Sequence, residues 1–273
     1  MNILRKLLFP FAVVYGWITG FRNFLYNKNV LESREYTIPI VCVGNLSVGG
    51  TGKSPMIEYL ISFLKNDYRI AVLSRGYKRT TKGFLEVAVN HTAAEVGDEP
   101  LQFKTKFPKV TVAVCADRRT GIENLKGKAD VILLDDAFQH RKVKASLNIL
   151  LTPFHDLFID DWMLPTGNLR EPRTGSKRAH CLVVTKCPSQ VPYATLQEIE
   201  LRMPIYNHQK LYFSKIGYGT IIKSTTETLP LEYLNDKPFT LVTGIADPLP
   251  LLKFLKDKQF NFVHQRFPDH HHF

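Results

Sequence analysis

A glycine-rich stretch at residues 44–54, Gly-Asn-Leu-Ser-Val-Gly-Gly-Thr-Gly-Lys-Ser, limits the folds that this chain can adopt. It follows an apolar run at 38–43, which is typical of a buried strand, and it precedes residues 55–64, which have a helical pattern. A strand, a Gly-rich turn and a helix together direct backbone N–H groups and the positive end of the helix towards an anion. The sequence therefore predicts a phosphate-binding loop.

The side chains of this loop have separate expected roles. Lys53 is expected to reach the outer phosphates of a nucleotide, and the Ser54 hydroxyl to ligate Mg²⁺. The first glycine of the pattern G-x-x-x-x-G-K-[ST] would fall at Ser47, but the three glycines that follow keep the loop flexible. A Gly-rich turn with a chance Lys-Ser pair is the alternative. The predicted nucleotide-binding residues are Ser47, Val48, Gly49, Gly50, Thr51, Gly52, Lys53 and Ser54.

A second nucleotide-site signal lies about 80 residues further along the chain. Residues 130–134 form a largely apolar run that ends in Asp135 and Asp136. A strand that ends in aspartate can hold a carboxylate rigidly opposite the phosphate loop, where it holds Mg²⁺ or its water. Strand-like runs alternate with helical patterns, which predicts an α/β P-loop NTPase with a wound, mostly parallel sheet. These further runs are 69–74, 110–115, 147–151 and 181–186.

The N-terminal segment favours a membrane interface. Residues 7–21 form a run of 15 positions without charge, and basic residues lie at both ends of the segment. A spanning helix needs ~20 apolar residues, so the run is short. On a helix its apolar residues form one stripe, as in a helix that lies in a membrane interface. A core helix packed on the sheet, a spanning helix and a signal peptide remain as alternatives.

The composition limits the classes of binding partner but does not rank them. The formal charge is +11, which favours an acidic partner, either nucleic acid, an anionic membrane surface or a phosphorylated substrate. The four cysteines are scattered without a C-x-x-C pair, which indicates reduced thiols in a cytosolic protein.

Six motifs taken together resemble the tetraacyldisaccharide 4'-kinases, the lipid A 4'-kinases of bacteria that build an outer membrane. The resemblance covers nearly the whole chain in the right order. The family usually has Gly at the position of Ala137, and it usually continues past the last motif with a segment that contains Thr-Glu-Lys-Asp. The absence of that segment raises truncation as an alternative. The motifs are residues 44–55, 73–77 (LSRGY), 96–100 (VGDEP), 135–140 (DDAFQH), 167–172 (GNLREP) and 267–271 (FPDHH).

The resemblance implies ATP-dependent phosphorylation of the 4'-hydroxyl of a tetraacylated glucosamine disaccharide 1-phosphate. It implies ATP and Mg²⁺ as cofactors, a lipid-linked disaccharide substrate, and a peripheral or monotopic location at the cytoplasmic face of the inner membrane. It implies neither nucleic acid nor a protein partner. The expected domains are an N-terminal membrane-associated helix (1–30), a P-loop kinase core (31–190) and a smaller C-terminal lobe (191–273).

By the same resemblance, Asp98 and His270 form a carboxylate–imidazole pair that accepts the proton of the sugar hydroxyl. Lys53 and Asp136 complete the expected catalytic set, and the expected metal ligands are Ser54, Asp135 and Asp136. A membrane-associated P-loop NTPase that acts as a switch or a metal-insertion chaperone is the alternative function, and a degenerate binding protein is a third. The candidate substrate contacts are Arg75, Arg118, Gln139, His140, Arg170 and Glu171.

Overall fold

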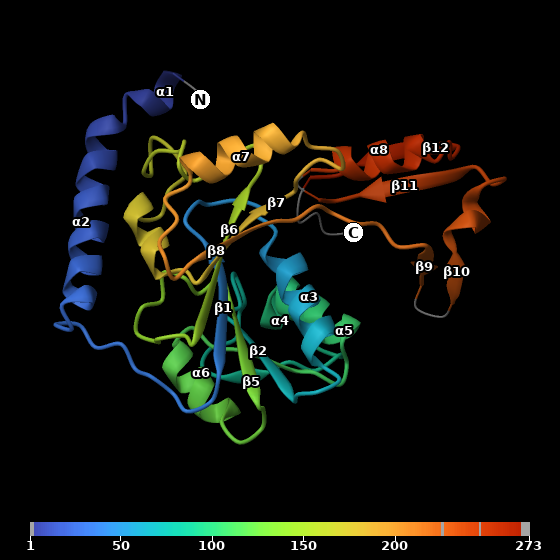
Figure 1. The fold of residues 1–273 in the computed structure, drawn as a ribbon. Coiled ribbons are helices and arrows are strands. Elements are labelled where there is room, and N and C mark those ends of the chain that lie inside the picture. Colours follow the sequence, from blue (N-terminus) through green and yellow to red (C-terminus); the bar gives the residue numbers. More distant parts are fainter. Residues whose placement is uncertain (1–2, 225–226, 246, 269–273) are drawn as a thin grey trace. The chain divides into compact units, whose positions relative to one another are not determined.

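The strand that precedes the Gly-rich loop, β1 (Ile40–Asn45), lies in the interior of an eight-stranded sheet (Figure 1). The strand order is β3-β4-β2-β5-β1-β6-β7-β8, and β3 is antiparallel to β4 while the other neighbours run parallel. The wound, mostly parallel sheet predicted from the sequence is therefore confirmed. The other strands are β2 (Ile70–Ser74), β3 (Leu85–Glu86), β4 (Thr111–Val114), β5 (Val131–Asp135), β6 (Leu147–Pro153), β7 (Cys181–Thr185) and β8 (Lys210–Phe213).

The computed structural model describes residues 3–224, 227–245 and 247–268. The chain forms two compact units, residues 1–215 and residues 216–273. The sequence predicts that the second lobe begins near residue 190. The structure divides the chain later, because β8 pairs with β7 and so belongs to the main sheet.

Helices cover both faces of the main sheet. One face packs against α3 (Lys53–Leu64) and α5 (Asp98–Lys106), through buried residues such as Ile57 and Phe103. The other face packs against α6 (Arg118–Leu125) and α7 (Tyr193–Arg202), through residues such as Ile122. Alternate residues of β1 point into the two cores. The remaining helices of this unit are α1 (Ile3–Lys6), α2 (Phe9–Asn27), α4 (Ala93–Val96) and the 3₁₀ helix η1 (Arg173–Arg178).

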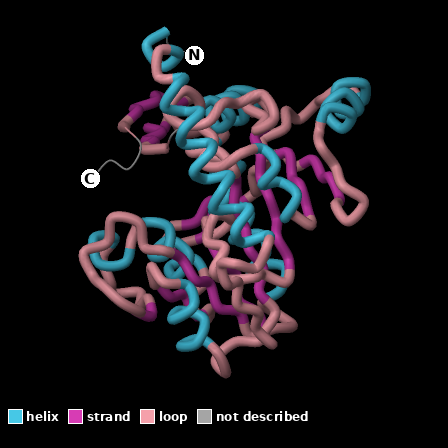
Figure 2. The backbone as a smooth tube through the Cα atoms, turned by 90° about the vertical axis from the view of Figure 1, so that its left-hand side faces the viewer, coloured by secondary structure: helices cyan, strands magenta, loops and turns pink. Residues whose placement is uncertain are grey.

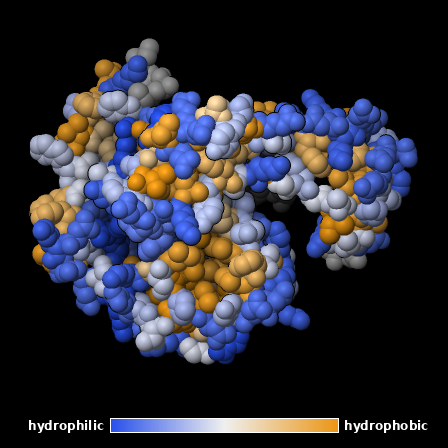
Figure 3. All heavy atoms as spheres, viewed as in Figure 1, coloured by the Kyte–Doolittle hydropathy of each residue, from blue (hydrophilic) through white to orange (hydrophobic). Residues whose placement is uncertain are grey.

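Helix α2 lies along one flank of this unit and crosses over its loops and strands (Figure 2). Pro10 lies in the first turn of α2, which begins at Phe9, so its missing N–H removes no helical hydrogen bond and the helix is not kinked there. Trp17, Ile18 and Phe21 are at least 63% exposed. Apolar side chains therefore face outward along α2 (Figure 3), and the helix is not the core helix that the sequence left as an alternative. Among the described residues no helix has the length and apolar content needed to cross a membrane.

The second unit contains a hairpin and a small parallel pair. Strands β9 (Ile221–Lys223) and β10 (Thr228–Pro230) pair antiparallel, and β11 (Phe239–Thr243) pairs in parallel with β12 (Phe262–Arg266). Two helices complete the unit, the 3₁₀ helix η2 (Leu231–Leu234) and α8 (Leu249–Asp257).

Candidate active site

The chain passes from β1 to α3 through the Gly-rich loop, with Gly52 at the N-cap of α3. Gly49 and Gly52 have φ angles of 110° and 90°, in the region that favours glycine. A Cβ at Gly49 would meet no atom within 4 Å, so the backbone conformation and not a lack of space requires glycine there. Ser47 does not adopt a positive φ. The loop therefore has no need of the first glycine of the pattern.

Neighbouring segments hold this loop on both sides. Ser47 forms an isolated antiparallel bridge with Leu169. On the other side, the Thr185 hydroxyl at the end of β7 donates to the carbonyl oxygen of Thr51 at 2.8 Å. The Thr51 hydroxyl accepts from the side-chain amide of Asn45 at 2.9 Å. These contacts fix the loop conformation before any ligand binds.

Asp135 is the last residue of β5, which runs parallel with β1, so it lies at the same end of the strands as the phosphate loop. It is 2% exposed. Its Oδ2 accepts a hydrogen bond from the Ser74 hydroxyl, and its Oδ1 is buried without a hydrogen-bond partner among the described residues. Burial raises the pKa of Asp135 to about 7, and the negative charge of Glu99 acts in the same direction. A bound cation would lower that pKa and give Oδ1 its partner.

The next residue, Asp136, lies between two cations. Its Oδ1 is 3.8 Å from Nζ of Lys53. Both of its carboxylate oxygens accept from Nη1 of Arg170 at 3.0 Å. The side chain of Lys53 is only 11% exposed. Asp136 thus holds the lysine of the phosphate loop beside the position where nucleotide phosphates bind in such loops.

The start of α5 meets the phosphate loop. The Ser54 hydroxyl donates to Oε1 of Glu99 in the first turn of α5. Asp98 begins this helix, directly after Gly97, whose φ is 94°. A Cβ at Gly97 would lie 3.4 Å from Cα of Gly76, so the Arg-Gly-Tyr loop packs closely against the start of the helix. Asp98 therefore lies next to the residue that bonds to Ser54, close to the start of α3.

Two of the predicted substrate contacts, Arg118 and His140, are at least partly buried. Arg118 is 2% exposed, and its guanidinium donates to the carbonyl oxygens of Cys115 at 2.7 Å and Asp135 at 3.3 Å. Burial lowers the pKa of the Arg118 guanidinium. Burial also lowers the pKa of His140 to about 4, with the charge of Arg118 acting in the same direction, so His140 is neutral at pH 7. Arg75, by contrast, is exposed.

Glu171 is the centre of a hydrogen-bond network and is 3% exposed. Its Oε1 accepts from Arg178 at 2.8 Å and from Gln139 at 3.0 Å. Its Oε2 accepts from the Asn23 amide of α2 at 2.7 Å. Gln139 also donates to the carbonyl oxygen of Asn45 at 2.7 Å. Gln139 and Glu171, both predicted as substrate contacts, thus join the end of β1, the motif loops and α2.

Helix α2 contacts the same motif loops at two further points. The Tyr15 hydroxyl donates to the carbonyl oxygen of Arg170 at 2.9 Å. Arg22 donates to the carbonyl oxygen of Gln139 at 2.9 Å. The N-terminal helix is therefore connected directly to the segments that carry the candidate site.

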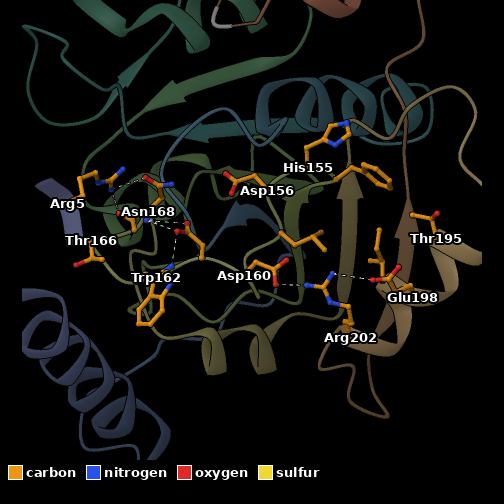
Figure 4. A pocket seen from close by; sticks show the side chains of 15 residues that line it. Arg5, His155, Asp156, Asp160, Trp162, Thr166, Asn168, Thr195, Glu198 and Arg202 are labelled. Atoms are coloured by element: carbon orange, nitrogen blue, oxygen red, sulfur yellow. Dashed lines mark hydrogen bonds and ion pairs between the residues drawn. The ribbon is translucent and has the colours of Figure 1, made fainter. Parts of the chain in front are cut away.

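A cavity of about 630 Å³ opens beside residues 166–168, at the start of the motif Gly-Asn-Leu-Arg-Glu-Pro (Figure 4). Arg5 lies at one side and donates to Oδ1 of Asn168 at 3.1 Å. On the opposite side Arg202 lies between Asp160 and Glu198. This cavity is lined by residues of the segment after β6 and of α7, and none of its lining residues belongs to the phosphate loop.

The structure also brings in residues that the sequence analysis had not selected. Ser74 bonds to Asp135, and Glu99 bonds to Ser54. Both belong to quoted motifs, but only the pairing of distant segments shows which motif residue faces the phosphate loop. Lys186 follows β7, and its Nζ would be 3.7 Å from a Cβ at Gly50. His270 lies outside the described residues, and so does its expected pairing with Asp98.

Comparison with known proteins gives consistent matches. The family model described as tetraacyldisaccharide-1-P 4'-kinase, LpxK, matches residues 4–273. The tetraacyldisaccharide 4'-kinase of Flavobacterium johnsoniae is 50% identical over all of this chain and 81% of its own length. The protein of the same name from Bacteroides thetaiotaomicron is 45% identical over 99% of this chain and 75% of its own. The crystal structure of LpxK from Aquifex aeolicus in complex with ATP has a TM-score of 0.81 at 36% identity, covering 98% of this chain and 83% of that one.

Proposed function

Because the chain belongs to the tetraacyldisaccharide-1-P 4'-kinase family, we propose that it transfers the γ-phosphate of ATP to the 4'-hydroxyl of a tetraacyldisaccharide 1-phosphate. The observation that supports this proposal is that three parts of the site lie together at the C-terminal ends of the parallel strands. These parts are the preformed phosphate loop, the carboxylates that end β5, and the start of α5 with Asp98. Phosphoryl transfer depends mainly on positioning and on neutralising charge, and these parts can supply both.

Nucleotide binding is assigned to residues 47–54. The backbone amides of the loop and the start of α3 surround the phosphates, and Lys53 contacts the outer ones. Lys53 now lies 3.8 Å from Asp136, and Arg170 holds that carboxylate from the other side. When Lys53 turns to the phosphates, Arg170 still compensates the charge of Asp136.

The donor set fits Mg²⁺. The hydroxyl of Ser54 and the buried Oδ1 of Asp135, which has no hydrogen-bond partner in the described part of the chain, are oxygen ligands of the kind that Mg²⁺ prefers. Of the two neighbouring aspartates we assign Asp135 to the metal, because both oxygens of Asp136 already accept from Arg170. A metal ion held by Ser54 and Asp135 would help to neutralise the negative charge of the phosphates during transfer. A hydroxyl and one or two carboxylates suffice for such a site because phosphate oxygens and water complete it.

Proton transfer is assigned to Asp98, with His270 as its partner. Asp98 begins α5 beside Glu99, which bonds to Ser54, so it lies close to the phosphate loop. A carboxylate within reach of the acceptor hydroxyl can take its proton, and an imidazole partner can share the charge that develops. This assignment rests on the position of Asp98 and on the family resemblance of the 267–271 motif.

We assign α2 to the membrane surface, which is the cytoplasmic face of the inner membrane if the substrate is the family's. Its outward face is apolar, with Trp17 76% exposed and Phe11 67% exposed. Amphipathic helices of this kind lie in the interface with the apolar face buried among lipids. Since α2 also bonds to the motif loops through Asn23 and Tyr15, the same helix can present a lipid-linked substrate to the site.

The test is transfer of labelled γ-phosphate from ATP to purified tetraacyldisaccharide 1-phosphate in detergent micelles. The parent is expected to form labelled bisphosphorylated lipid. Lys53→Ala should lower the rate by about 10² or more, because it removes a cation that stabilises the transferring phosphate. Lys65→Ala is the matched control, since Lys65 is exposed at the other end of α3, where its ammonium lies over the ring of Phe107.

Asp98→Ala and His270→Ala test the proton acceptor, and each should lower the rate by about 10². If the folded parent binds ATP and yields no labelled lipid, the kinase proposal is wrong. ATP turnover that a protein partner stimulates without any acceptor lipid would instead favour the NTPase switch.

A further inference from the structure

A second cavity lies on the flank of the main sheet. Its volume is about 590 Å³. Part of its wall comes from Asn148 near the start of β6, from His180 directly before β7 and from His208 shortly before β8. These strands run parallel with β1, so their starts lie at the sheet edge opposite the end of β1 that leads into the phosphate loop. The lining of this flank cavity extends to Ala137, Phe138 and His140 of the motif loop after β5, but it includes no residue of the phosphate loop 47–54.

The flank cavity has an excess of positive charge. Lys144 pairs with Glu35, and Arg178 pairs with Glu171. Arg141 and Lys177 have no carboxylate partner among the described residues. The lining therefore holds four permanent cations and one carboxylate, namely Arg141, Lys144, Lys177, Arg178 and Glu35.

Arg141 makes its hydrogen bonds and its ring contact with neutral groups. Its guanidinium donates to the carbonyl oxygen of Asn23 at 2.8 Å and to Oδ1 of Asn27 at 2.7 Å, and it lies 4.9 Å from the ring centre of Tyr26. Burial, together with the positive charge of Arg178, lowers the pKa of Arg141 to about 10. An anion in the cavity would offset both effects.

Two residues of the lining each have a buried polar atom without a hydrogen-bond partner in the part of the chain that the structure describes. These atoms are the hydroxyl oxygen of Tyr36 and Nε2 of His140. Buried polar groups are nearly always hydrogen-bonded in folded proteins, so such atoms need an explanation. Nδ1 of His180 accepts from the backbone N–H of Asn148 at 2.9 Å, which leaves Nε2 of neutral His180 as a donor. The cavity thus combines cationic and neutral hydrogen-bond donors.

We propose that the flank cavity binds a phosphate group, held by Arg141, Lys177 and the Tyr36 hydroxyl. A planar guanidinium, an ammonium and a hydroxyl are donors suited to a multiply charged oxyanion. The cavity is much larger than one phosphate ion, so its ligand is an organic phosphate. The adjoining end of α2 has Phe24 51% exposed, and a phospholipid head group or a soluble phosphate compound can supply the group. The inference does not depend on the kinase activity.

Inorganic phosphate is the first probe, used in a Lys53→Ala background so that the phosphate loop contributes little. Phosphate should raise the melting temperature above that in chloride of equal ionic strength. Lys177→Met should weaken the apparent phosphate affinity about tenfold. Lys210→Met is the matched control, because Lys210 is an exposed lysine of β8 outside the cavity lining, and it should bind as the background does.

Tyr36→Phe separates binding from folding. The Tyr36 hydroxyl has no partner among the described residues, so its removal should weaken phosphate affinity without lowering the melting temperature in chloride. Equal protection by phosphate in the background, in Lys177→Met and in Tyr36→Phe would overturn the proposal.

Vesicles of phosphatidylcholine with and without phosphatidic acid then identify the source of the phosphate group. If Lys177→Met loses binding to the phosphatidic acid vesicles and Lys210→Met retains it, a lipid head group is the ligand. If both variants bind these vesicles alike while Lys177→Met has lost affinity for inorganic phosphate, a soluble phosphate compound is supported. If Lys177→Met changes neither phosphate nor vesicle binding, the proposal is wrong.

Discussion

Replacing Asp135 with Asn is expected to stabilise the nucleotide-free protein, and more strongly at pH 8 than at pH 5. Asp135 is buried, and its pKa is raised from 3.8 to about 7. Between these two pH values the folded state holds a proton that the unfolded state releases. The parent therefore loses stability as pH rises towards 7, and it regains none above that. Asn keeps the shape of the side chain and can still accept from Ser74, but it has no charge to bury.

The size of the effect follows from the same linkage. One pH unit corresponds to about 1.4 kcal/mol, so the gain of the Asn variant over the parent should grow by up to roughly 3 kcal/mol between pH 5 and pH 8. The measurement is urea unfolding of both proteins at several pH values, without nucleotide or Mg²⁺. Asp130→Asn is the control. The Asp130 side chain is 40% exposed, and the hydrogen bond from Arg69 lowers its pKa. Its stabilising contribution is therefore lost only at acid pH and stays constant from pH 5 to 8. A difference between the Asp135 variant and the parent that stays constant over this range would refute the reasoning.

Three further results are expected. Glu171→Gln should lower the free energy of unfolding, measured in urea, by about 2–4 kcal/mol, because it leaves the partly buried Arg178 without its carboxylate. Glu198 is an exposed residue of α7, so Glu198→Gln should change this free energy by less than about 0.5 kcal/mol. Equal effects of the two substitutions would contradict the role of Glu171 in the network. Trp17→Ser combined with Phe21→Ser should reduce binding to phospholipid vesicles about tenfold or more and leave ATP binding unchanged. If vesicle binding does not change, the assignment of α2 to the membrane surface is wrong. Gly52→Ala should lower ATP affinity about tenfold, because the N-cap φ of 90° is strained for alanine, whereas Gly217→Ala meets no atom within 4 Å and should not.

Much of the main sheet could be predicted because its signals are local. Buried parallel strands appear as short apolar runs, and the ends of β1 and β5 carry residues whose pattern is itself the signal. The C-terminal boundary of the first unit could not be predicted in this way. Residues 210–213 alternate between exposed and half-buried positions, as an edge strand does, so their sequence gives little sign that they complete the main sheet.

The site was only partly predictable, for a related reason. Motif residues can be recognised in the sequence, but their contacts depend on segments that are far apart in the chain and that the fold brings together. Glu171 and Gln139 were expected to touch substrate, yet their polar atoms bond to Asn23, Arg178 and Asn45. A buried carboxylate that serves structure and an exposed one that binds substrate look the same in one sequence. Burial separates them, and burial follows only from the fold.

The position of Glu171 has a consequence for how the N-terminal helix and the phosphate loop are linked. Glu171 bonds to Asn23 of α2, and its neighbour Arg170 holds Asp136, which in turn lies 3.8 Å from Lys53. The adjacent residues Arg170 and Glu171 therefore connect the helix that we assign to the membrane with the lysine that we assign to the nucleotide. Each contact in this chain is charged or charge-assisted, and such contacts depend strongly on geometry. A shift of α2 would act directly on Glu171 through Asn23 and on Arg170 through Tyr15. If the chain is the kinase that we propose, we expect these two residues to link the lipid surface to phosphate transfer.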